Sequence, residues 1–328
     1  MSELALAAFA AETGEHVVSE PKSARFERFR KRFDEAAFRA RLAARGIRWI
    51  ARSEPSFPTA LRSIFDPPPG LFLRGDAAVE LLDRPAVAIV GARACSAYGA
   101  HVARTFGREL AGAGLVVVSG MARGVDGEVH RGALEAGGAT VAVLGCGVDR
   151  DYPAAHADLA RRIAAEGLVV SEYPPGVEPA PWRFPARNRI IAGLAQATVV
   201  VEARERSGAL ITADLALEEG REVFAVPGEI TSALSAGTNA LLRLGATAAT
   251  SALDVLEGFG LCLSELPAPG LSVGAEAVLG RVRDRPVSAD ELARGLGLEA
   301  GAVAAALTEL ELSGLVTEAS GIYRGTAN

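Results

Sequence analysis

Short, continuous apolar runs recur along the middle of this 328-residue chain. The runs are rich in valine, which is typical of strands that are buried on both faces of a sheet. Helix-length, alanine-rich segments separate most of the runs, and this alternation predicts a doubly wound parallel α/β sheet with right-handed crossovers. We place this core at residues 67–258, beginning at the helix-breaking stretch 67–70. The six predicted strands are residues 86–90, 115–119, 140–144, 168–172, 197–202 and 222–226.

The segment before the core, residues 1–66, predicts a small helical domain. Residues 1–20 suggest a loosely ordered lead-in. Ser23 can then cap a helix with three phenylalanines on one face, and a second helix, roughly 34–45, ends at Gly46. Twelve basic and four acidic side chains lie between residues 22 and 62. The domain therefore exposes either an ordinary solvated face or a contact for DNA or a partner.

A linker at residues 259–270, which contains Pro267, Pro269 and Gly270, precedes a last domain at residues 271–328. This domain shows three short helices followed by a hairpin with Ser320-Gly321 at its tip, which predicts a winged helix. Its third helix contains three glutamates and no lysine or arginine. That charge would repel phosphate, so the sequence disfavours a transcription regulator that reads DNA through this helix.

Composition limits the compartment and the class of partner. Three cysteines, at positions 95, 146 and 262, are too few and too scattered for a disulfide framework or a thiolate metal site. No apolar run reaches the roughly 18 residues that span a bilayer, and the acidic N-terminus does not resemble a signal peptide. We therefore expect a cytoplasmic protein without membrane contact. Its net charge is −6, so any nucleic acid must be attracted by local basic patches.

Arginines and glycines directly follow several predicted strands. In a parallel sheet, ligands bind beyond the carboxyl ends of the strands, where glycines allow close backbone approach and helix N-termini attract anions. Guanidinium groups that converge on one rim require an anion, so the rim predicts a phosphate site. The plainer alternative is a set of ordinary turns with an ion pair between Arg123 and Asp126. The residues that support the phosphate site are Arg93, Arg123, Gly124, Arg204, Arg206, Ser207 and Gly208.

The stretch 182–193 places two aromatic residues and three arginines within eight positions, where a loop enters a helix. Aromatic rings stack on unpaired bases and arginines contact phosphates, so the stretch predicts a platform for single-stranded nucleic acid. The residues concerned are Trp182, Arg183, Phe184, Arg187, Asn188 and Arg189. In the alternative, Phe184 belongs to the core, Trp182 covers it and Arg189 pairs with Glu202.

Several of these segments together resemble the DNA-processing protein A (DprA, also Smf) family, and they follow in that family's order. The motifs are IVGARACSAYG (89–99), SGMARGVDGEVHRGAL (119–134), VLGCGVDRDYP (143–153), SEYPPG (171–176), FPARNRIIAGLA (184–195), and residues 199–230 and 232–246. The resemblance implies a sterile-alpha-motif-like N-terminal domain, a Rossmann-like core and a winged-helix tail. It also implies a homodimer that binds single-stranded DNA and loads the RecA recombinase during natural transformation, with no cofactor.

The resemblance carries the family's DNA-facing pocket over to particular positions. These are Arg93, Ser119, Gly120, Arg123, Phe184, Arg187 and Asn188, with Ser207 and Gly208 nearby. The local pattern adds Gly124, Trp182 and Arg189 as DNA contacts. The chain departs from the family in its short N-terminal domain, which lacks an obvious helix–hairpin–helix pattern, and in the bulk of Trp182.

An enzyme is the alternative function. Phosphoribohydrolases of the lysine-decarboxylase-like type bind a nucleoside monophosphate at the same rim and cleave its glycosidic bond, which requires a positioned carboxylate. Glu202 and Glu219 are the acids best placed for that role. The sequence shows no Walker lysine, no metal-ligand spacing, no nucleophile–base pair and no glycine-dense PGGxGT signature. We therefore expect a binding protein without turnover of its own and without a metal.

Overall fold

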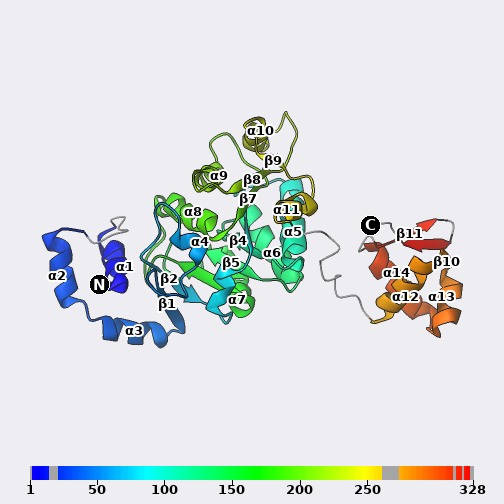
Figure 1. Ribbon diagram of the computed structural model, residues 1–328, viewed down its shortest axis with the longest axis horizontal. Coiled ribbons are helices and arrows are strands. Elements are labelled where there is room, and N and C mark those ends of the chain that lie inside the picture. The colour runs from blue at the N-terminus through cyan, green and yellow to red at the C-terminus, as the bar shows by residue number, and fades with distance from the viewer. Residues whose placement is uncertain (1, 15–20, 261–272, 313–314, 320, 326–328) are drawn as a thin grey trace. The chain divides into compact units, whose positions relative to one another are not determined.

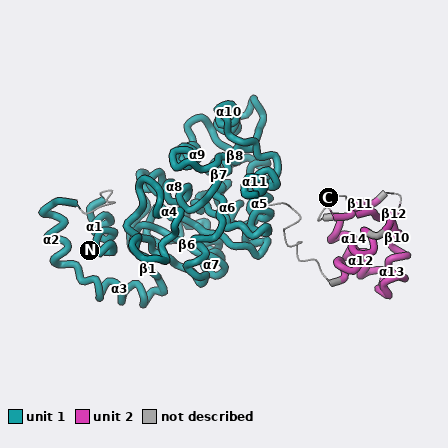
Figure 2. Tube along the Cα trace, in the orientation of Figure 1, with its two compact units in different colours: residues 1–266 teal, residues 267–328 magenta. Residues whose placement is uncertain are grey.

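The computed structural model describes residues 2–14, 21–260, 273–312, 315–319 and 321–325. The chain forms two compact units, residues 1–266 and residues 267–328 (Figure 2). Most of the linker expected at 259–270 lies outside the described residues. Ser320, at the tip of the expected hairpin, also lies outside them. No described helix is long and apolar enough to cross a membrane.

A nine-stranded sheet with the order β1-β2-β6-β5-β4-β3-β7-β8-β9 forms the centre of the first unit. The strands from β3 to β9 are parallel, whereas β1 and β2 are antiparallel to their neighbours. All six predicted strands are present, which confirms the predicted fold class. The strands are β1 (Ile47–Ala51), β2 (Gly70–Arg74), β3 (Ala86–Val90), β4 (Val116–Ser119), β5 (Thr140–Val143), β6 (Leu168–Ser171), β7 (Ala197–Val200), β8 (Glu222–Ala225) and β9 (Thr247–Ala248).

Helices cover both faces of this sheet (Figure 1). Alternate residues of β3 explain why its whole run is apolar: Ala88 packs with the core under α8 and α9, whereas Val87 and Ile89 pack with the core under α5 and α6. The helices of this unit are α1 (Glu3–Thr13), α2 (Ala24–Arg32), α3 (Glu35–Ala43), α4 (Thr59–Arg62), α5 (Ala97–Gly112), α6 (Val125–Glu135), α7 (Ala157–Glu166), α8 (Arg183–Leu194), α9 (Gly208–Glu218), α10 (Ala236–Arg243) and α11 (Ala252–Gly258). Two 3₁₀ helices, η1 (Val79–Asp83) and η2 (Ala154–His156), complete it.

The direction of winding reverses between β3 and β7. From β3 the chain proceeds through β4 and β5 to β6 on one side, and from β7 it proceeds to β8 and β9 on the other. The loops that leave β3 and β7 therefore diverge, and they leave a crevice beyond the carboxyl ends of these two neighbouring strands.

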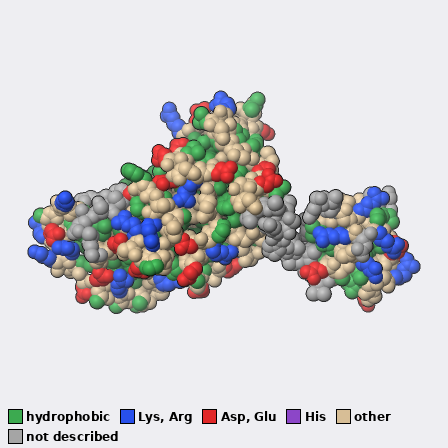
Figure 3. All heavy atoms as spheres, in the orientation of Figure 1, with side chains coloured by type: hydrophobic (Ala, Val, Ile, Leu, Met, Phe, Trp, Pro, Cys, Tyr) green, Lys and Arg blue, Asp and Glu red, His purple; other side chains and the backbone are tan. Residues whose placement is uncertain are grey.

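The N-terminal helices are more firmly packed than the sequence suggests. The expectation of a loosely ordered lead-in is wrong for residues 3–13, because α1 buries Leu4 through Phe9. Phe9 packs edge-on against Phe26 and Phe29 of α2, and Ser23 caps α2 as predicted. Strand β1 joins the main sheet, so the predicted domain boundary at residue 66 falls between two strands of one sheet. Lys and Arg side chains lie on the outer edge of these helices (Figure 3).

The second unit has its own apolar core, built from Val278, Leu292, Leu310 and their neighbours. Three helices pack against a three-stranded sheet with the order β10-β12-β11, which is a winged-helix arrangement. Its elements are α12 (Val273–Asp284), β10 (Val287–Ser288), α13 (Ala289–Leu296), α14 (Ala300–Leu312), β11 (Val316–Ala319) and β12 (Ile322–Gly325).

Candidate nucleic-acid interface

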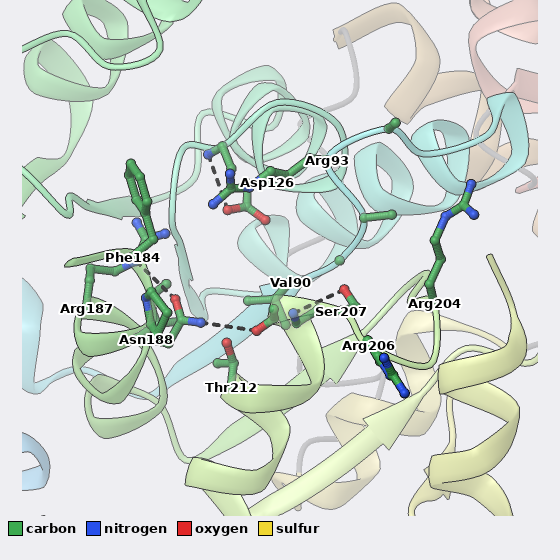
Figure 4. Close-up of a pocket in the computed structure, with 18 of the residues that line it drawn as sticks. Val90, Arg93, Asp126, Phe184, Arg187, Asn188, Arg204, Arg206, Ser207 and Thr212 are labelled. Atoms are coloured by element: carbon green, nitrogen blue, oxygen red, sulfur yellow. Dashed lines mark hydrogen bonds between the residues drawn. The ribbon is translucent and has the colours of Figure 1, made fainter. Parts of the chain in front are cut away.

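A pocket of about 300 Å³ opens where the winding reverses, beyond the ends of β3 and β7. The loops after these strands and the first turns of α8 and α9 form its walls (Figure 4). Among the residues that line it are Arg93, Asp126, Phe184, Arg187, Asn188, Arg204, Arg206, Ser207, Gly208 and Thr212.

Three arginines of the pocket expose their side chains to solvent. Arg93 follows β3, and Arg204 and Arg206 lie on the loop before α9. None of the three forms an ion pair within the described part of the chain. The same loop ends at Ser207, whose Oγ accepts a hydrogen bond from the N–H of Ala209, 3.3 Å away, so the N-terminus of α9 also points at the pocket. Free guanidinium groups beside a helix N-terminus favour an anion.

Arg187 has a different environment, because it is buried in the pocket wall. Its Nη1 donates to the carbonyl oxygens of Gly120, at 2.8 Å, and of Val143, and its Nε donates to Oδ1 of Asn188 at 3.2 Å. Burial lowers the pKa of Arg187 to about 10, while the charge of Asp126 opposes this shift. The guanidinium therefore stays protonated at neutral pH, and its position is fixed by backbone carbonyls.

Glycines make room for this arrangement. A Cβ at Gly120 would lie 2.5 Å from Nη2 of Arg187, so a larger residue would displace the guanidinium. Gly124 has a φ of 74°, and a Cβ there would lie 2.2 Å from the carbonyl oxygen of Ala92. Only glycine adopts this conformation readily, so Gly124 lets the loop after β4 pass close behind the loop after β3.

Phe184 joins the charged rim to an aromatic cluster. The guanidinium carbon of Arg93 lies 5.1 Å from the centroid of the Phe184 ring. On the loop after β5, the ring of Tyr152 is stacked on Phe184 with centroids 5.5 Å apart. Trp182 is 43% exposed and packs beside Arg183, whose guanidinium lies 4.9 Å from the Trp182 centroid. Tyr152 was not among the predicted site residues.

The structure brings half of the predicted site residues together in the pocket, namely Arg93, Phe184, Arg187, Asn188, Ser207 and Gly208. Ser119 and Gly120 are buried behind it, and Oγ of Ser119 donates to the carbonyl of Ile89. Arg123 is exposed but does not line the pocket, and the alternative ion pair with Asp126 is not present. Arg204 and Arg206 were noted on the rim in the sequence, and they line the pocket beside the assigned residues.

Arg189 is tied into the protein interior. Its Nη atoms donate to both carboxylate oxygens of Glu172, at 3.0 and 2.7 Å, and its Nε donates to Asp66 at 3.0 Å. The alternative in which Arg189 pairs with Glu202 is therefore wrong. Burial opposes the charge of Arg189, but the two carboxylates outweigh burial and raise its pKa. The side chain is 9% exposed and does not line the pocket, because it anchors α8 to the end of β6.

The two acids considered for catalysis lie in segments of the chain before and after α9. Glu202 precedes α9, is buried, and accepts hydrogen bonds from the N–H and Oγ of Ser96. Glu219 follows the last residue of this 11-residue helix and accepts the N–H of Phe65 at 2.8 Å. Because β7 and β8 are parallel, Glu202 after the end of β7 and Glu219 before the start of β8 lie at opposite edges of the sheet, so both cannot act on one bond.

Within the described part of the chain, no group of three His, Cys, Asp or Glu side chains could hold a metal ion. His130 and His156 are buried behind the pocket wall, where their Nδ1 atoms bond to Oγ1 of Thr140 and the carbonyl of Met121, at 2.7 and 3.0 Å. Burial lowers the pKa of His130 to about 3, so this ring is neutral.

The fold and the site define a Rossmann-like α/β protein that has an arginine-rimmed pocket at its switch point and carries a winged-helix unit. The family model for DNA recombination-mediator protein A matches residues 48–260, and the model for the DprA winged helix domain matches residues 264–321. The chain belongs to the DprA/Smf family.

Known proteins agree with this assignment. The DNA processing protein DprA of Streptococcus pneumoniae is 48% identical over 203 residues, which cover 62% of this chain and 71% of that protein. The X-ray structure of S. pneumoniae DprA gives a TM-score of 0.67 at 38% identity, with 78% of this chain and 92% of that one covered. DNA processing protein A of Helicobacter pylori, solved to show its single-stranded DNA binding mode, gives 0.59 at 32% identity, with 65% and 95% covered.

Proposed function

We propose that the chain binds single-stranded DNA in the pocket between β3 and β7, and that it delivers the strand to the RecA recombinase. The observation that carries the proposal is the charge of the pocket. Four arginines and one acidic residue line it, although the whole chain has a net charge of −6. A local excess of positive charge in an acidic protein indicates a site for an anion.

The aromatic groups and the size of the pocket favour an unpaired strand. A volume of about 300 Å³ is at the small end of ligand sites, so it suits one nucleotide and not a duplex. Arg93 lies against the ring of Phe184, and Tyr152 is stacked on the same ring, so aromatic surfaces lie close to a candidate phosphate contact. This combination is typical of proteins that bind single strands. The single-stranded DNA binding described for the H. pylori relative supports the same ligand.

Membership of the DprA/Smf family supports the remaining parts of the proposal. These are action as a homodimer, RecA as partner, a role in recombination and natural transformation in the cytoplasm, and the absence of turnover. Four exposed aliphatic side chains, on α9, between β8 and α10 and directly after α10, are of the kind that a second copy would cover: Ile211, Leu217, Ile230 and Leu244. Light scattering tests the dimer, and a monomer at all concentrations contradicts it.

The pocket assignment is tested by titrating a labelled oligo(dT) strand at several salt concentrations. The triple variant Arg93→Ala/Arg204→Ala/Arg206→Ala should bind more weakly, and its salt slope should flatten by about 0.7 per lost contact, or about 2 in all. The matched control is Arg108→Ala/Arg161→Ala/Arg162→Ala, which removes three exposed arginines away from the pocket. Equal affinities and slopes for the two triple variants would contradict the assignment.

The delivery step is tested by strand exchange on DNA precoated with single-strand-binding protein. The wild-type chain should shorten the lag before RecA acts, and Arg93→Ala/Arg204→Ala should not. We choose these two exposed residues because the buried Arg187 also supports the fold. An unchanged lag, together with hydrolysis of nucleoside monophosphates, would replace this proposal with the phosphoribohydrolase alternative.

A further inference from the structure

The ring of Tyr152 forms the outer end of a column that starts in the pocket. Arg93 lies against Phe184, with its guanidinium carbon 5.1 Å from the ring centroid. Phe184 in turn stacks on Tyr152, with centroids 5.5 Å apart and ring planes 23° from parallel. Tyr152 itself does not line the pocket. The column therefore extends the site by one aromatic ring beyond the pocket.

Phe184 is poorly placed to accept a base on its own. Arg93 and Tyr152 both contact its ring, and its edge fits against Gly145, where a Cβ would lie 3.0 Å from Cδ1. A base could stack on Phe184 only by displacing one of these neighbours. Tyr152, in contrast, is 41% exposed, so it offers free ring surface without any rearrangement.

The surroundings of Tyr152 suit a nucleic-acid strand. The two acids that precede it in the loop are each paired with an arginine: Asp151 with Arg74 at 2.7 Å, and Asp149 with Arg45 at 3.4 Å. They therefore repel a passing phosphate less than free carboxylates would. The hydroxyl of Tyr152 makes no hydrogen bond to a residue that the structure describes. Stacking on Phe184, and not a hydrogen bond of the hydroxyl, therefore holds the ring in place.

We propose that Tyr152 stacks on the base of the nucleotide next to the one held in the pocket, and so forms a second subsite for single-stranded DNA. This inference rests on the proposed function. The nucleotide in the pocket contacts Arg204 and Arg206, and the phosphate that joins it to the next nucleotide lies near Arg93. Phe184 supports the ring of Tyr152 from the side opposite the stacked base. Stacking on a ring requires an unpaired base but not a particular one, so the subsite selects single strands without reading sequence.

The test compares oligo(dT) with an equally long abasic strand, which keeps the phosphates and lacks the bases. Tyr152→Ala should weaken binding of oligo(dT) by about 5- to 150-fold, the range expected for one lost stacking contact. It should bind the abasic strand as the wild type does, with an unchanged salt slope. Tyr152→Phe keeps the ring and should match the wild type on both strands. The control Phe65→Ala removes an aromatic side chain that is 96% exposed and does not line the pocket.

Each other outcome overturns the inference in a recognisable way. If Tyr152→Ala binds oligo(dT) as tightly as the wild type, the subsite is absent while the proposed function stands. If the variant loses the same factor on both strands, Tyr152 supports only the shape of its loop. If the wild type binds neither strand, the proposed function fails together with the inference. Thermal unfolding of each variant distinguishes these results from a loss of folded protein.

Discussion

Removing the side chain of Arg189 should destabilise the first unit and leave the proposed DNA site intact. Arg189 and Glu172 are 9% and 8% exposed, and two hydrogen bonds of 2.7 and 3.0 Å join them. Breaking a buried pair of this kind costs about 3–5 kcal/mol, because the remaining charge has no partner. The contact with Asp66, which is 28% exposed, adds about 1 kcal/mol at most. We therefore expect Arg189→Met to lose about 3–5 kcal/mol of unfolding free energy, a large part of the 5–15 kcal/mol typical of a domain.

Urea unfolding followed by tryptophan fluorescence measures this loss. Both tryptophans of the chain, Trp49 and Trp182, lie in the first unit, so the signal does not include the winged helix. The double variant Arg189→Met/Glu172→Met should be more stable than Arg189→Met alone, because it leaves neither member of the Arg189–Glu172 pair without its partner. Folded Arg189→Met should bind oligo(dT) within a few-fold of the wild type. A variant of unchanged stability that binds DNA poorly would refute this reasoning and make Arg189 a DNA contact.

The pocket wall, a buried histidine and the winged-helix unit can each be perturbed separately. Gly120→Ala places a Cβ 2.5 Å from the Arg187 guanidinium, so it should lower both stability, by about 1–3 kcal/mol, and oligo(dT) affinity in the same two assays. His130 has its pKa lowered by burial from 6.5 to about 3. Its contribution to the free energy of unfolding is therefore complete above about pH 6.5 and declines by up to about 1.4 kcal/mol per pH unit as the pH falls towards 3. Urea unfolding at several pH values should show a weaker pH dependence for His130→Gln than for the wild type. A chain that ends at residue 266 should keep its oligo(dT) affinity, and a large loss with a normal urea transition would contradict this.

The sequence predicted the middle of the sheet well because burial on both faces leaves a local pattern. Every residue of β3 is apolar, and every residue is buried. The edge strands leave no such pattern. Strand β1 contains Arg48 and β2 follows three prolines, and each pairs antiparallel with a segment that local sequence does not identify. Helix α1 was missed for the opposite reason: its core segment is apolar on all sides, so it lacks an amphipathic period.

The candidate site was only partly predictable, because partners far away in the chain decide where each arginine points. Arg187 and Arg189 lie two positions apart on α8, and both were interpreted as DNA contacts. Glu172 and Asp66, which are 17 and 123 positions from Arg189, draw that side chain into the interior. The carbonyls of Gly120 and Val143 hold Arg187 in the pocket wall. Tyr152 was missed because its stacking partner is 32 positions away in the sequence.

The two arginine environments have different consequences for the proposed binding and release of a strand. Backbone carbonyl oxygens hold the guanidinium of Arg187 in place, so its positive charge stays at a fixed position in the pocket wall. Arg93, Arg204 and Arg206 are exposed, and contacts between exposed charges contribute only about 0.2–1 kcal/mol each and are screened within about 8 Å at physiological salt. A strand held at the rim by such contacts can leave one phosphate at a time. Ion pairs between phosphates and deeply buried arginines would instead have to break together. The pocket therefore combines a fixed geometry with weak individual contacts, and this combination suits the proposed transfer of DNA to a second protein better than its long-term storage.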